Sequence, residues 1–222
     1  MNDVIEGHWT AHEIIQYYNS FGIPHFQRGL VWGPEATSLL LESIFFETPC
    51  GTIILWEPEE PCKEGQPLCN SNTPRYLIVD GQQRIRSLYS ALADHRESAD
   101  PEGGDDEGVD GDSTGGGSQS RLWCVNLSRL PGMADLFDAD QARYPLFRLV
   151  ADPRGEQARF KYNLLPIREL AEKQHDRLIP LIRPNGGCSV EDVLRRMERL
   201  RLADRVQALW GNPVFSVKVL RE

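Results

Sequence analysis

Five consecutive residues, Asp80-Gly81-Gln82-Gln83-Arg84, join an apolar strand-like run to a helix-like run, and their types suit phosphate chemistry. The first turn of a helix presents backbone N–H groups without intrahelical partners at the positive end of its dipole, which favours anions. Gly81 would let a ligand approach the backbone, and the guanidinium of Arg84 matches phosphate oxygens. Two amides can position a base, a ribose or a water molecule.

Asp80 ends the apolar run, where its carboxylate could hold a divalent ion or orient an attacking water. A plainer interpretation is also open, in which Asp80 caps the helix and Arg84 forms a surface ion pair. Capping accounts for Asp80 and Gly81 but leaves Gln82, Gln83 and Arg84 unexplained. The five residues therefore favour a phosphate-handling turn, with Asp80 as the candidate metal ligand.

The runs around this turn predict the elements that position it. Two β-branched, apolar runs at 51–57 and 75–81 predict a pair of strands joined by a polar loop. Apolar residues three and four apart predict a helix over about 82–94.

The N-terminal part predicts two helices separated by an extended segment. Apolar periodicity predicts the first helix at 10–22, and Pro24 favours extended geometry at 23–32. The second helix is expected at 33–49, with Pro34 in its first turn, where a missing N–H costs nothing.

A glycine-rich, acidic stretch at about 97–120 interrupts the pattern. Eight acidic and no basic residues lie between Glu97 and Asp112. Such a composition cannot bury enough apolar surface to order itself, so we expect a flexible insertion. Because strand-like sequence resumes directly after it, the insertion is expected to lie within a single domain of residues 1–222.

The C-terminal half predicts a smaller set of strands and a helical part. Strand-like runs are expected at 121–127, 144–151, 158–167 and 212–222. One long helix is expected at 189–211, opened by a capping-box pair of Ser189 and Asp192. Because the last strand leads to nothing further, we expect the chain to be the N-terminal part of a longer protein.

Composition and charge exclude several classes of protein. The sequence has 222 residues, no apolar run of membrane-spanning length and no secretion signal, so a cytoplasmic protein is expected. Five scattered cysteines favour reduced thiols and make a zinc site a poor interpretation. No P-loop motif, G-x-S-x-G motif or Cys/His constellation is present.

The net charge of −9 hides a basic C-terminal half, with 18 Lys and Arg against 13 Asp and Glu from Arg121 onward. Arg195, Arg196 and Arg199 lie on the predicted long helix and are candidate contacts to DNA phosphates. The alternative is a solvated helix face with ion pairs between neighbouring turns, such as Asp192 with Arg196.

The order of motifs resembles the N-terminal domain of GmrSD-type modification-dependent restriction proteins, in the ParB/sulfiredoxin-like superfamily. The resemblance rests on "IPHFQRGLVW", then "LLLESIFFETPCGTIILWE", then "YLIVDGQQRIRSLYSAL". It extends through "RLWCVNL" and "PLFRLV" to the Arg-rich helix, so it covers nearly the whole chain from about residue 20. It implies an α/β (α+β) fold, with a small mixed sheet, flanking helices and a C-terminal helical part.

The resemblance also implies nucleoside triphosphate hydrolysis, usually with Mg²⁺ or another divalent ion, coupled to attack on foreign or modified phage DNA. Asp80, Gln82, Gln83 and Arg84 match the family's catalytic positions. Gly81, Arg84, Gln27 and Arg28 match its nucleotide-binding positions. Phe26 and Trp32, in the upstream motif, are interpreted as core residues instead of base-stacking platforms. Which of GTP, ATP, CTP or UTP is used stays open.

Two departures from the family pattern matter. The later Asn/Gly motif and the His-Asn nuclease domain of family members do not appear within these 222 residues. We therefore expect an HNH-type nuclease on another domain or subunit, and association between copies of this chain stays open. Rival interpretations are a non-catalytic nucleotide switch, a module that senses modified DNA, and direct nicking. The last lacks a cluster of carboxylates.

Overall fold

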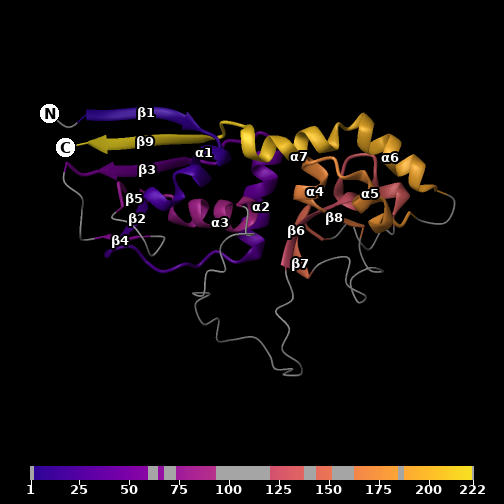
Figure 1. Cartoon of the computed structure of the whole chain (residues 1–222), viewed down its shortest axis with the longest axis horizontal. Helices are drawn as coiled ribbons and strands as arrows, with labels where there is room; N and C mark the ends of the chain where they lie inside the picture. Colours follow the sequence, from indigo (N-terminus) through magenta and orange to yellow (C-terminus); the bar gives the residue numbers. More distant parts are fainter. Residues whose placement is uncertain are drawn as a thin grey trace, which may run out of the picture.

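The computed structural model describes residues 3–59, 65–67, 74–93, 121–137, 144–151, 163–184 and 188–221. Two sheets lie side by side along the long axis, and α2 and α7 lie between them (Figure 1). The insertion expected at 97–120 lies outside the described residues. The mixed sheets and helices confirm the α+β class.

The larger sheet has six strands in the order β1-β9-β3-β5-β2-β4. Their bounds are β1 Asp3–Trp9, β2 Phe21–Pro24, β3 Thr52–Glu57, β4 Gly65–Pro67, β5 Tyr76–Asp80 and β9 Phe215–Arg221. The predicted pairing of the runs at 51–57 and 75–81 is confirmed, since β3 and β5 are antiparallel neighbours. The final strand, β9, lies inside the sheet, antiparallel to β1 and parallel to β3.

Strand β1 has no counterpart in the sequence prediction. Its residues mix Asp3, Glu6, Gly7 and His8 with few apolar ones, so the alternation typical of a half-buried strand is weak. The strand forms because β9 supplies backbone partners along its whole length. Tertiary pairing, and not local pattern, therefore determines this element.

Three helices pack beside the larger sheet: α1 Ala11–Gln16, α2 Pro34–Phe45 and α3 Gln82–Leu92. The predicted helix at 10–22 ends early, because a short 3₁₀ turn, η1 Tyr18–Ser20, leads into β2. The ring of Tyr18 is buried and stacks on Tyr89 of α3. The buried ring of Tyr18 and the start of β2 therefore occupy the positions where the last turns of the helix were expected.

The smaller sheet is antiparallel, in the order β7-β6-β8. Its strands are β6 Arg121–Asn126, β7 Phe147–Ala151 and β8 Leu164–Pro166, which confirms strands at 121–127 and 144–151 and places a short one within 158–167. The short elements of this part are η2 Leu127–Arg129, η3 Ala134–Leu136, α4 Ile167–Ala171, α5 His175–Leu178 and η5 Ile179–Leu181.

The long helix expected at 189–211 is two helices, α6 Val190–Arg199 and α7 Leu202–Gly211. The break is at Arg201, whose φ of +50° is left-handed. Buried residues step by five from Met197 to Leu202, which a straight helix cannot keep on one face. The break lets each helix bury its own side. The capping box of Ser189 and Asp192 is confirmed.

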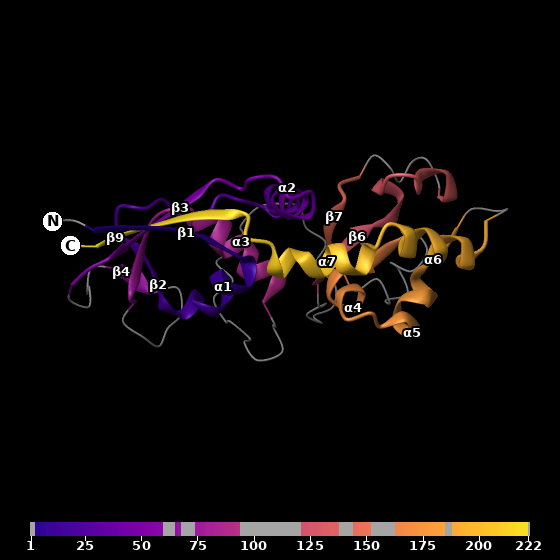
Figure 2. The same ribbon diagram turned by 90° about the horizontal axis from the view of Figure 1, so that it is seen from above.

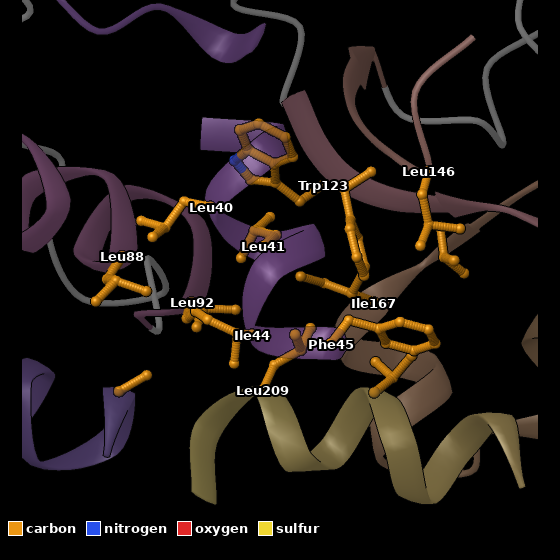
Figure 3. Close-up of a cluster of buried hydrophobic side chains, with 14 of the residues drawn as sticks. Leu40, Leu41, Ile44, Phe45, Leu88, Leu92, Trp123, Leu146, Ile167 and Leu209 are labelled. Atoms are coloured by element: carbon orange, nitrogen blue, oxygen red, sulfur yellow. The ribbon is translucent and has the colours of Figure 1, made fainter. Parts of the chain in front are cut away.

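A single hydrophobic cluster joins both sheets, and α2 lies at its centre (Figure 3). Leu40 of α2 lies on the side of α3, whereas Phe45 meets Phe147 of β7 with ring centroids 5.7 Å apart. Figure 2 shows α2 and α7 between the two sheets from above. Within the described residues, no helix is long and apolar enough to cross a membrane.

Candidate nucleotide site

The Asp-Gly-Gln-Gln-Arg turn begins with an irregular end to β5. Ile54 pairs with Asp80 and Leu55 pairs with Ile78, so Val79 is an extra residue in a β-bulge. The carbonyl of Val79 accepts a hydrogen bond of 2.6 Å from Nε2 of Gln27. Gln27, in the upstream F-Q-R motif, thus donates a hydrogen bond to the backbone carbonyl of the extra residue in the bulge. This bond joins the upstream motif to the strand before the turn.

Gly81 is the N-cap of α3, with a left-handed φ of +97° and no side-chain cap. A Cβ on Gly81 would lie 3.0 Å from Cγ1 of Ile53, so both conformation and space favour glycine. Asp80 does not cap the helix, and the plainer interpretation of that residue is therefore wrong. The first-turn N–H groups of α3 have no side-chain acceptor among the described residues, which leaves them available to an anion.

Gln83 uses both ends of its amide to hold the loop between β2 and α2. Its Oε1 accepts from the N–H groups of Val31 and Trp32, both at 3.1 Å. Its Nε2 donates to the carbonyl of Gly29, also at 3.1 Å. Gln27 and Gln83 together fix this loop against the turn.

Arg84 is held by two oxygens and is only 17% exposed in its side chain. Its Nη2 pairs with Oδ2 of Asp80 at 3.1 Å, and its Nη1 donates to the carbonyl of Cys50 at 3.1 Å. Gly51 makes room for this arrangement, since a Cβ there would fall 2.7 Å from Nη1 of Arg84. The pair leaves Asp80 61% exposed while fixing the direction of its carboxylate.

The thiol of Cys50 lies beside this arginine and is not activated by it. Burial raises the pKa of Cys50 to about 11, against the opposing influence of the Arg84 charge. Its Sγ donates to the carbonyl of Thr48 at 3.3 Å. Cys50 therefore contributes a backbone oxygen to the site and stays a protonated thiol near neutral pH.

Gln82 differs from Gln83 because its amide is uncommitted. The residue is 5% exposed and its side chain makes no hydrogen bond with any part of the chain that the structure describes, yet its amide atoms are not among the fully enclosed polar atoms that lack a partner. The amide therefore reaches solvent, where a ligand could replace water. Arg28 is exposed and forms no ion pair within the described ranges, so it too is available.

A divalent ion fits this site only together with substrate oxygens. No group of three or more His, Cys, Asp or Glu side chains gathers among the described residues. Mg²⁺ keeps several waters and is commonly bound by one or two carboxylates plus substrate phosphates. The exposed carboxylate of Asp80 suits an ion that arrives with a nucleotide.

The interpretation of Phe26 as a core residue is wrong, because the side chain is 77% exposed in the loop between β2 and α2, called here the pinned loop because Gln27 and Gln83 hold it. Leu30 and Val31 follow it with 53% and 60% exposure. Trp32 packs against the hydrophobic cluster, as expected. The loop therefore presents apolar side chains to solvent next to Arg28.

The three arginines of α6 that are candidate DNA contacts differ in whether they already form ion pairs within the protein. Arg196 pairs with Asp135 at 2.8 Å, lowers the pKa of that carboxyl, and also donates to the carbonyl of Gly132. Arg195 lies 3.8 Å from both Glu191 and Asp192. Arg199, at the end of α6, has no ion pair within the described ranges.

Some features of the site have no signal in the sequence. The carbonyls of Cys50 and Val79 act through the backbone, which any residue type supplies. Gly51 carries the one clue, as a glycine that opens a predicted strand.

A family model described as "GmrSD restriction endonuclease, N-terminal domain" matches residues 11–183. The chain is also similar to an uncharacterized protein of Methanocaldococcus jannaschii, with 32% identity over 87 residues. That match covers 34% of this chain and 15% of the relative. The family match spans the turn, the loop between β2 and α2 and the elements from α1 to η5, and it leaves out β1, α6, α7 and β9.

Proposed function

The chain belongs to the family of GmrSD restriction endonuclease N-terminal domains, and from this premise we propose that the Asp80–Arg84 turn binds and hydrolyses a nucleoside triphosphate. The observation that carries the proposal is the start of α3. Its uncapped N–H groups lie next to Gln82, whose amide makes no hydrogen bond within the described residues, and Asp80, an exposed carboxylate held by Arg84.

We assign the phosphates to the backbone of residues 81–84, with Arg28 reaching them from the pinned loop. Phosphate oxygens at a helix N-terminus gain from both hydrogen bonds and the helix dipole. Mg²⁺ bound with the nucleotide would offset phosphate charge, and Asp80 would hold that ion. Arg84 keeps Asp80 oriented and adds positive charge behind it.

In hydrolysis a water molecule attacks the terminal phosphorus and the bond to the bridging oxygen breaks, which gives the diphosphate and phosphate. Catalysis of this step is mostly positioning and charge stabilisation. We assign the positioning of the water to Gln82, whose amide is free. Gln83 and Gln27 act as positioning residues, because their amides are bonded to the backbone.

The biological setting we propose is defence against foreign or modified DNA, with an HNH-type nuclease supplied by another domain or subunit. For DNA contact we favour Arg199 over Arg196, because Asp135 already neutralises Arg196. Arg205 of α7 adds a second guanidinium near the α6–α7 break, stacked 4.3 Å from the ring centroid of Phe45.

The first test measures phosphate release from ATP, GTP, CTP and UTP with Mg²⁺, with and without phage DNA. We compare the wild type with Asp80→Asn and, as a matched surface control, Asp176→Asn. Turnover by the wild type and the control that is lost in Asp80→Asn supports the proposal. Tight nucleotide binding without turnover would favour the nucleotide switch, and absence of any nucleotide effect would contradict the proposal.

The DNA contact is tested by the salt dependence of binding to a duplex. Removing a phosphate contact should lower the slope of log K against log salt by about 1 for each arginine. We expect Arg199→Ala with Arg205→Ala to lower the slope, whereas Arg196→Ala should change it little. Equal effects of all three substitutions would contradict the assignment.

A further inference from the structure

Strand β1 lies at the edge of the larger sheet, and one of its two sides has no strand beside it among the residues that the structure describes (Figure 1). Natural sheets commonly protect such edges with Pro, Lys, a bulge or a very short strand. β1 has seven residues, contains neither Pro nor Lys, and pairs with β9 in an unbroken register. The charge of its Glu6 is already matched by Lys218 of β9 at 2.6 Å.

Apolar side chains lie exposed along this edge. Val4 is 47% exposed and Ile5 is 41% exposed, one on each face of the strand. Near its end, Trp9 stacks on Tyr17, which is 41% exposed, with ring centroids 5.1 Å apart. The edge thus combines free backbone groups with apolar side chains on both faces.

We propose that β1 pairs antiparallel with β1 of a second copy, which joins two larger sheets into one. Homo-oligomers most commonly have two-fold symmetry, and a two-fold axis makes the same strand face itself. Opposite residues in an antiparallel pair both point their N–H groups towards the partner or both away. The axis must therefore pass between a residue and its own copy.

Three registers meet this condition near the middle of β1, with the axis at Ile5, Glu6 or Gly7. The axis at Glu6 sets two carboxylates face to face, and the axis at Ile5 sets Glu6 opposite Val4. The axis at Gly7 sets Glu6 opposite His8 and Ile5 opposite Trp9, twice each.

Pairs of hydrogen-bonding side chains and pairs of aromatic with β-branched residues both stabilise sheets. His8 is exposed, and Glu6 keeps 62% of its side chain exposed beside Lys218, so a Glu6 oxygen can also accept a hydrogen bond from the ring of His8 across the strands. Of the three registers, the one centred on Gly7 is therefore self-complementary. The partner that the exposed edge of β1 fits is a second copy of this chain.

The register is tested by disulfide trapping. Opposite Cα atoms in an antiparallel pair lie about 4.5–5.5 Å apart, within the range that a disulfide spans. A Cβ on Gly7 meets nothing within 4 Å, so Gly7→Cys leaves the fold undisturbed. Val4→Cys is the matched control on the same strand, because its two copies would lie about 20 Å apart.

We expect mild oxidation to convert Gly7→Cys into a covalent dimer that a reductant reverses. The wild type, with its natural cysteines, and Val4→Cys should stay monomeric on a non-reducing gel. Absence of the Gly7→Cys dimer, or trapping of both variants equally, would overturn the proposal.

The dimer itself is tested on the untrapped protein by sedimentation over a range of concentrations. The wild type should associate reversibly, and Ile5→Lys should not, because it adds an exposed lysine to the edge opposite Trp9. Thermal melting confirms that the variant is folded. A wild type that stays monomeric, or a folded Ile5→Lys that still dimerises, would overturn the proposal.

Discussion

At the scale of single residues, two adjacent glutamines have different tasks. Gln83 has three backbone partners in the loop between β2 and α2, whereas Gln82 is buried and has no partner among the described residues. Their identical chemistry and adjacent positions hide this difference in the sequence. It depends on where the loop backbone lies, and no local pattern encodes that.

Gln82→Ala should lower kcat for nucleotide hydrolysis by about 10²-fold or more, as expected for loss of a group that positions the water. The melting temperature should change little, because no intramolecular hydrogen bond is lost. Exposed Gln207 of α7 provides the control, since Gln207→Ala should leave both quantities unchanged. Unchanged kcat in Gln82→Ala would remove this residue from the proposed mechanism.

Gln83→Ala should act through stability and through KM. It leaves three backbone groups of the loop without partners, which we expect to cost about 1–3 kcal/mol in the free energy of unfolding. Urea unfolding measures this cost, and limited proteolysis near Gly29 reports loosening of the loop. A stable Gln83→Ala protein with lowered kcat would instead place Gln83 in the chemistry.

Cys50 gives stability a dependence on alkaline pH. Its pKa, raised by burial to about 11, exceeds that of an unfolded cysteine, about 8.5. The folded state therefore holds the proton more tightly, and this stabilisation is complete below pH 8.5 and is lost as the pH rises towards 11. The free energy of unfolding of the wild type and of Cys50→Ala, measured at pH 8 and at pH 10.5, checks this prediction. The wild type should lose more stability than Cys50→Ala when the pH is raised from 8 to 10.5. Parallel losses would contradict the prediction.

At the scale of elements, three described helices are followed closely by a non-glycine residue with left-handed φ: Glu47 after α2, Lys173 after α4 and Arg201 after α6. Glu47 follows α2 with a left-handed φ of +56°, which costs a non-glycine residue about 1 kcal/mol. Glu47→Gly should raise the free energy of unfolding by about 0.5–1 kcal/mol. Glu47→Ala removes the same side chain but keeps the strain, so it should not stabilise. Equal effects of the two substitutions would show that the side chain, and not the backbone, matters.

Elements with strong local signals were predictable from the sequence, and those made by distant partners were not. The helix at 34–45 follows from its apolar face and from Pro34, and the pair β3 and β5 follows from two β-branched runs. Strand β1 depends on β9, which lies far from it in the sequence. The break at Arg201 depends on which side each half of the expected helix buries, a fact of packing.

At the scale of the whole molecule, the two sheets share a core through α2 (Figure 3). Leu41 is fully buried there, so Leu41→Ala should cost about 2–5 kcal/mol in the free energy of unfolding. Leu39, on the outer face of the same helix, is 65% exposed, and Leu39→Ala should change stability by less than about 0.5 kcal/mol.

The same substitution tests whether the two sheets unfold together. Calorimetry of Leu41→Ala should show one transition at a lower temperature, because the shared cluster couples both parts. Two separated transitions would show that the sheets are independent units.

The position of β9 has a consequence for synthesis on the ribosome. Asp3 pairs with Arg221, so β1 is made long before the residues that form its one partner in the described sheet. At about 5–20 residues per second, that wait lasts on the order of 10–40 seconds. Throughout it, β1 and β3 both expose strand edges that β9 will later occupy. A nascent chain of this protein should therefore depend on chaperones that cover open strands until β9 has been made.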